Sequence, residues 1–188
     1  MKRLLFIFAL TAVAMTAGAQ TYELNEQGAY EKVTVVHVDS TVTAAVLFDR
    51  AMTALSDWAG PDGKSRVNVD YQNQETHTII YKGRYSLGFK NVFLGAGWNR
   101  YADFTLKVRC KDGRAQVTVN VPTMTAIHNS QHIEQQYTVR EVVDALANSS
   151  GKHQARGKQL MEDMINTADG IIEAMSERLK NEASDDDF

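Results

Sequence analysis

Apolar and polar residues alternate strictly along two neighbouring segments in the middle of the chain, residues 102–110 and 115–121. Such alternation predicts two strands, each with one apolar and one polar face. Asp112-Gly113 lies between them and favours a two-residue type I′ turn, which would join the strands as a hairpin. The turn sets the expected pairs: Lys111 with Arg114, Cys110 with Ala115, Val108 with Val117, Leu106 with Val119 and Phe104 with Val121. A shift by one residue would expose the whole apolar set to water.

Three other segments carry the signals of helices. Residues 41–58 place apolar side chains on one face at helical spacing, with Ser40 or Thr41 as the expected N-cap. A capping-box pattern, Thr138 to Glu141, predicts a short helix that reaches about Ala147. A longer apolar stripe predicts a helix over about residues 153–180. The stripe of this last helix consists of Leu160, Met164, Ala168, Ile171, Met175 and Leu179.

Strands are expected over residues 33–38, 67–71 and 76–85, which are rich in β-branched or alternating apolar residues. Residues 122–138 allow two interpretations, a loop or an additional edge strand over Ile133–Tyr137. The element order predicts an α+β fold of two layers, β-α-β-β-β-β-α. An antiparallel sheet of four to five strands would have its helices packed on one face.

The first residues are typical of a secretory signal peptide. Met1-Lys2-Arg3 is basic, residues 4–15 are apolar, and Ala17-Gly18-Ala19 is a cleavage pattern. We therefore expect export to the periplasm or beyond, with residues 1–19 removed. No later segment is apolar enough to predict a membrane span. Residues 20–29 are expected to form a polar lead-in, 30–181 a single domain and 182–188 an acidic tail.

Charge and composition narrow the functional classes. The formal net charge is −3, which argues against nucleic-acid binding because that function needs a basic surface. Cys110 is the only cysteine, so it is expected to be buried and inert, or paired with another chain. No motif of a nucleophilic, phosphate-binding or paired-carboxylate enzyme is present. We predict no catalytic residue, no metal site and no cofactor.

Three short stretches resemble a known family: residues 43–51 in the first helix, Ile79-Ile80-Tyr81-Lys82-Gly83 in the third strand, and residues 108–114 at the hairpin. Together with the signal peptide, they are similar to secreted Gram-negative proteins grouped as a domain of unknown function with a TATA-binding-protein-like fold. The resemblance covers about residues 30–125. It implies a strand–helix–four-strand–helix architecture and brings no activity and no catalytic residues with it.

Two surfaces are candidates for binding. Residues 87–98 join two strands and are more apolar than an ordinary loop, so they form a contact surface, cover an open end of the core or extend the hairpin. The polar face of the sheet is the second candidate. The binding residues predicted from these two surfaces are Phe89, Phe93, Leu94, Trp98, Lys107 and Arg109.

These features favour a non-catalytic module that binds an envelope protein or a small ligand, as a monomer or weak homodimer. Two alternatives remain open. His128 and His132 are four residues apart, a spacing that on a helix could hold a metal for a hydrolase. The long helix or a sheet edge could instead join copies of the chain in a structural homo-oligomer.

Overall fold

The computed structural model describes residues 22–58, 66–93 and 96–181. Its elements are β1 (Tyr30–His37), α1 (Ala44–Trp58), β2 (Arg66–Asn73), β3 (Thr78–Phe93), β4 (Ala96–Lys111), β5 (Arg114–His128), β6 (Glu134–Thr138), α2 (Val139–Ala147) and α3 (Gly151–Lys180). The strands form one antiparallel sheet in the order β1-β5-β4-β3-β2, and β6 also pairs with β5. The α+β class and the antiparallel sheet are therefore confirmed, but the sheet has six strands instead of four to five.

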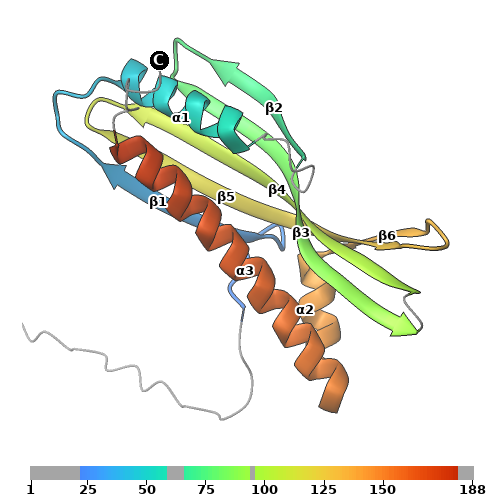
Figure 1. Cartoon of the computed structure of the whole chain (residues 1–188). Coiled ribbons are helices and arrows are strands. Elements are labelled where there is room, and N and C mark those ends of the chain that lie inside the picture. The colour runs from blue at the N-terminus through green and yellow to red at the C-terminus, as the bar shows by residue number, and fades with distance from the viewer. Residues whose placement is uncertain (1–21, 59–65, 94–95, 182–188) are drawn as a thin grey trace, which may run out of the picture.

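Helices α1 and α3 cross the same face of this sheet (Figure 1). The covered face carries the alternating apolar residues of β4 and β5, among which Leu106, Val117 and Val119 have no exposed surface. The helices contribute Leu47 and Phe48 from α1 and a row of methionines from α3: Met161, Met164 and Met175. The Tyr85 hydroxyl donates to the Met164 carbonyl at 3.0 Å, which satisfies the polar end of a buried side chain.

The β4–β5 hairpin has the predicted register from Lys111–Arg114 out to Leu106–Val119. The predicted type I′ turn is wrong, because that turn needs a positive φ at both central residues. Gly113 has φ 71°, whereas Asp112 is not among the residues with a positive φ. The turn instead bonds to the segment before α1. The Val38 amide donates to the Gly113 carbonyl at 3.0 Å, and the Gly113 amide donates to the Val42 carbonyl at 2.9 Å.

The same segment changes the start of α1, which begins at Ala44 and not at residue 41. Neither Ser40 nor Thr41 caps it. The Ala44 amide donates to a carboxylate oxygen of Asp112 at 2.8 Å, and the Val46 amide donates to the Thr43 hydroxyl at 3.4 Å. An acid from the hairpin turn thus satisfies a free helix amide, which local sequence could not indicate.

The predicted pairing of Phe104 with Val121 fails because of a β-bulge. Thr105 pairs with Asn120 and Asp103 with Thr123, so Val121 and Pro122 together stand opposite Phe104. Proline has no N–H to donate, and strands accommodate it at bulges and edges. Pairing with β1 ends at Val121, and pairing with β6 starts at Thr123. One edge of β5 therefore serves two strands in succession, and the possible edge strand is confirmed as β6.

The connection expected over residues 87–98 is mostly strand. β3 continues to Phe93 and β4 starts at Ala96, so residues 87–93 and 96–98 extend the hairpin past the helices (Figure 1). Gly97 permits the close pairing there, because a Cβ atom at this position would overlap the Lys90 carbonyl oxygen. Its amide donates to the Asn129 side chain at 2.9 Å, and its carbonyl accepts from the Asn129 amide at 3.0 Å.

We expect Gly97→Ala to lower the free energy of unfolding by about 1–3 kcal/mol, because the added methyl group forces backbone apart in a packed hairpin. Gly170→Ala is the matched control, since nothing lies within 4 Å of the position that its Cβ would take on α3. That control should raise stability by about 0.5–1 kcal/mol through helix propensity. Urea unfolding measures both values, and equal effects would contradict the close approach at Gly97.

Candidate binding face of the sheet

The face of the sheet opposite α1 and α3, called here the open face, carries the polar positions of β4 and β5. One row of directly paired residues crosses five strands on it: Tyr71, Ile80, Lys107, Thr118 and Val33. Tyr71 is 45% exposed and Val33 is 48% exposed. The predicted residue Lys107 stands in the middle of this row, between apolar side chains at its two ends.

Next to this row lies a hollow of about 420 Å³, whose walls come from β2, β3, β4 and the bulge in β5. Gly83 of β3 lines it, and Pro122 lines it on the side of β5. Lys82 and Arg84 supply positive charge, and Asp103 supplies negative charge. The hollow therefore lies where the bulge interrupts an otherwise regular sheet face.

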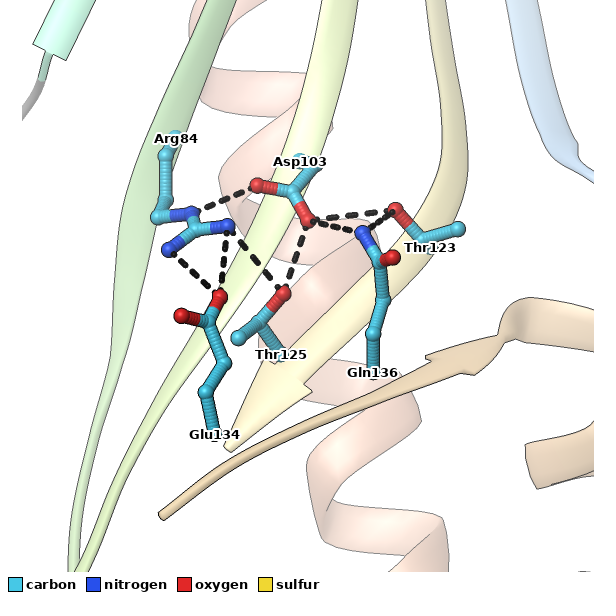
Figure 2. Close-up of polar contacts among 6 residues, drawn as sticks. All are labelled: Arg84, Asp103, Thr123, Thr125, Glu134 and Gln136. Atoms are coloured by element: carbon cyan, nitrogen blue, oxygen red, sulfur yellow. Dashed lines mark hydrogen bonds and ion pairs between the residues drawn. The ribbon is translucent and has the colours of Figure 1, made fainter. Parts of the chain in front are cut away.

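A polar network borders this hollow and links four strands (Figure 2). Arg84 Nε of β3 lies 2.6 Å from the Asp103 carboxylate of β4. The hydroxyls of Thr123 and Thr125 in β5 donate to the other oxygen of that carboxylate at 3.1 and 2.9 Å. From β6, one carboxylate oxygen of Glu134 accepts hydrogen bonds from both terminal nitrogens of Arg84, at 3.3 Å each. The guanidinium also lies 5.8 Å from the centre of the Tyr101 ring.

This network keeps Asp103 ionised. Burial alone would raise the pKa of the Asp103 carboxyl, but hydrogen bonds from Arg84, Thr125 and Thr123 and the Arg84 charge hold that pKa below its ordinary value. Thr125 is 1% exposed, and its hydroxyl is satisfied because it accepts from Arg84 at 3.3 Å and donates to Asp103. Within this network each of these polar groups has a hydrogen-bond partner, and the bonds to Glu134 and Gln136 hold β6 against the sheet.

The predicted binding residues fall into two groups. Lys107 and Arg109 lie on the open face, since both alternate with buried residues of β4. Phe89 pairs with Asn99 and continues this face, where it is 45% exposed and covers Gly97. Trp98 pairs with Lys90 and His128 and therefore lies on the opposite face.

Phe89 and Trp98 consequently do not form one apolar surface. The Trp98 ring packs edge-on against His128 with 4.9 Å between ring centres. Leu94 lies outside the described residues, and Phe93 is described as a strand position without its side chain. The roles predicted for these two residues remain predictions.

His128 and His132 do not share a helix. They flank the turn between β5 and β6, where the His132 amide donates to the His128 carbonyl at 3.0 Å and His132 has φ 53°. Nδ1 of His128 is within 3.2 Å of both the Ser130 hydroxyl and the Gln131 amide. Among the described residues, no group of three or more metal-ligating side chains occurs. The helical spacing on which the metal hypothesis depended is thus not realised.

Cys110 lies on the covered face and is 4% exposed. Burial raises the pKa of its thiol to about 12, so the reactive thiolate is scarce at neutral pH. The expected burial of this cysteine is confirmed. Sequence reasoning did not connect the six residues of the network, which only the bulge and β6 bring together: Arg84, Asp103, Thr123, Thr125, Glu134 and Gln136.

Solved structures with the same arrangement define the fold class. A TBP-like protein from Parabacteroides distasonis superposes with a TM-score of 0.61 at 12% identity, covering 85% of this chain and 97% of that one. A DUF4468 family protein from Bacteroides ovatus gives a TM-score of 0.59 at 13% identity, covering 86% of this chain and 91% of the other. At these identities the likeness establishes the fold alone.

The sequence profile of the family described as "Domain of unknown function (DUF4468) with TBP-like fold" matches residues 33–124. Residues 33–124 belong to this family, as the resemblance indicated. No curated protein matches the chain. In the part of the chain that the structure describes, no helix is both long and apolar enough to cross a membrane.

The network yields a prediction for the dependence of stability on pH. Because the folded pKa of Asp103 is lowered, its stabilising contribution is present above its unfolded pKa of about 3.9 and is lost as pH falls through the folded value. We expect Asp103→Asn to cost about 2 kcal/mol at pH 7, as loss of hydrogen bonds to a charged group does. The difference from the wild-type protein should shrink below about pH 4.

Urea unfolding from pH 7 down to pH 3 would measure this difference. Asp169→Asn is the control, because the ion pair of Asp169 with Lys32 is 41% exposed on both sides and should contribute about 1 kcal/mol or less. A gap between the wild-type and Asp103→Asn proteins that stayed constant with pH would show that the Asp103 charge does not fasten β6.

Proposed function

We propose that the protein is an exported, non-catalytic binding module of the cell envelope, and that its open face docks a partner. A single observation carries this proposal: within residues 22–58, 66–93 and 96–181 the helices lie against one face of the sheet, and the other face combines a hollow with half-exposed apolar side chains. A scaffold of this kind presents a broad surface without an assembled catalytic set.

The side chains of the open face suit a protein interface. Four apolar side chains on this face are each 45–48% exposed to water: Val33, Val35, Tyr71 and Phe89. Aromatic residues and arginine are enriched in the centres of interfaces. Tyr71 supplies an aromatic side chain at one end of the row, and Val33 adds exposed apolar surface at the other. Of the residues predicted for binding, Phe89, Lys107 and Arg109 share this face.

The rigidity of the open face favours the proposal too. Four strands of the face are connected by the Arg84–Asp103 network, so the hollow keeps its shape before a partner arrives. A binding surface that is already ordered loses less conformational entropy on association. The structural homo-oligomer is a special case of the same proposal, in which the partner is a second copy.

Native mass spectrometry of the protein, purified gently from its own envelope, tests the docking role. We expect a retained partner mass on the wild-type protein and at least about a tenfold loss of that species in Val33→Lys, because a charge would be buried at the contact. Val46→Lys is the control, since Val46 is 42% exposed on α1, away from the open face.

The two variants separate the outcomes. A complex that Val33→Lys retains as fully as Val46→Lys would contradict docking on the open face. A bare monomer in all three preparations, with no partner trapped by crosslinking beforehand, would contradict the binding role itself.

Export is tested by cell fractionation with intact mass measurement. The expected product lacks residues 1–19 and begins at Gln20. A variant with Leu5 and Leu10 both replaced by Arg should stay unprocessed in the cytoplasm, because the charges interrupt the apolar segment that the export machinery recognises. Full-length protein in the wild-type cytoplasm would contradict export.

A further inference from the structure

The end of the open face nearest the β4–β5 turn holds a second hollow, of about 240 Å³. We call it the cationic hollow. Its lining includes three positively charged residues, Arg109, Lys111 and Arg114, and none that is negatively charged. The neutral part of the lining includes Val35, Thr76 and Gln116. A local excess of positive charge stands out in a chain whose net charge is −3.

The cations lie close together by the register of the hairpin. Lys111 pairs directly with Arg114 across the two strands, and Arg109 is the next residue of β4 on the same face. Like charges placed directly opposite each other in a sheet are destabilising. The fold therefore carries an unfavourable electrostatic arrangement here, which a bound anion would relieve.

Nearby acids do not neutralise this cluster. Asp112 is in the turn itself, but its carboxylate accepts from the Ala44 amide at 2.8 Å on the side covered by α1. Glu75 precedes Thr76 in sequence and does not line the hollow. Within the described part of the chain, Arg109, Lys111 and Arg114 form no ion pair with a carboxylate, although Lys82, Arg84 and Lys32 all do.

We propose that the cationic hollow binds a phosphoryl group, held by Arg109 and Arg114 with Lys111 supplying a third positive charge. The planar guanidinium presents two parallel N–H donors that match phosphate oxygens. A phosphate monoester carries about −1.5 to −2 charges at pH 7, which suits three cations better than a single carboxylate does. Thr76 and Gln116 add neutral hydrogen-bonding groups beside them.

The size and wall of the hollow point to an ester. Its volume of about 240 Å³ is several times the ~30 Å³ that one water occupies in the liquid. Val35, 47% exposed, gives an apolar wall for the part of the ligand that carries the phosphoryl group. This inference rests on the proposed binding function and names the ligand chemistry for one end of the open face.

The test is a titration of the full mature protein with inorganic phosphate at constant ionic strength, followed by NMR of backbone amides and by the melting temperature. Phosphate should shift the amides of residues 109–116 and raise the melting temperature, while chloride should do neither. Arg109→Gln and Arg114→Gln should each weaken binding at least about tenfold, as removal of a charge-assisted hydrogen bond does. Arg156→Gln on α3 makes the same charge change elsewhere and should leave binding unaltered.

Equal responses to phosphate and chloride, or equal losses in all three variants, would overturn the proposal, because both indicate general screening of charge. Cosedimentation with phosphatidylcholine vesicles, with and without phosphatidic acid, distinguishes a lipid phosphate monoester from a soluble one. Arginine-dependent binding to phosphatidic acid together with a phosphate response assigns the phosphoryl group to lipid, and a phosphate response alone assigns it to a soluble ester. Vesicle binding without a phosphate response would overturn the phosphoryl site.

Val33→Lys keeps the two proposals separate. It lies outside the lining of the cationic hollow, so it should leave phosphate binding intact while it removes the docked partner. Loss of the phosphate response with a partner still retained would remove this inference alone. A phosphate response on a protein that docks no partner would remove the docking role alone.

Discussion

The register of the β4–β5 hairpin is the constraint on which the rest of this molecule depends. It decides that Leu106, Val108, Val117 and Val119 all face α1 and α3, and that the residues between them face water. Because side chains alternate strictly along a strand, the same pairing creates the apolar core and the open face at once. The cross-strand row through Lys107 and the pairing of Lys111 with Arg114 are consequences of that one register.

The local sequence pattern predicted the structure correctly where neighbouring residues alone determine it. Alternation from Ala102 to Val121 gave the paired strands, and Thr138 with Glu141 gave the start of α2, where both halves of the capping box are formed. It failed where a distant segment supplies the partner. The start of α1 is set by Asp112, which lies 68 residues away. The apolar segment near Phe89 was predicted as a connection because its apolar residues do not alternate and Gly88, Gly95 and Gly97 interrupt it.

The candidate site was the harder part to predict for the same reason. Lys107 and Arg109 could be placed on the polar face by counting along one strand. Asp103 could be placed there as well, but its partners come from β3, β5 and β6, and the Pro122 bulge shifts which residues of β5 reach it. Trp98 and Phe89 were grouped because they are close in sequence, and strand geometry then separated them onto opposite faces. A proline inside an otherwise regular strand was the available signal for the bulge.

The shared edge of β5 has a consequence for the order in which this sheet can be built. β1 is the first strand of the described chain, yet it pairs only with β5, so that Tyr30 meets Val121. Contacts between residues so far apart in sequence form slowly, because the intervening chain must first be ordered. The β3–β4 and β4–β5 hairpins are local and can form early, whereas β1 stays unpaired until β5 has formed. We therefore expect β1, the first strand of the described chain, to be the last to join the sheet.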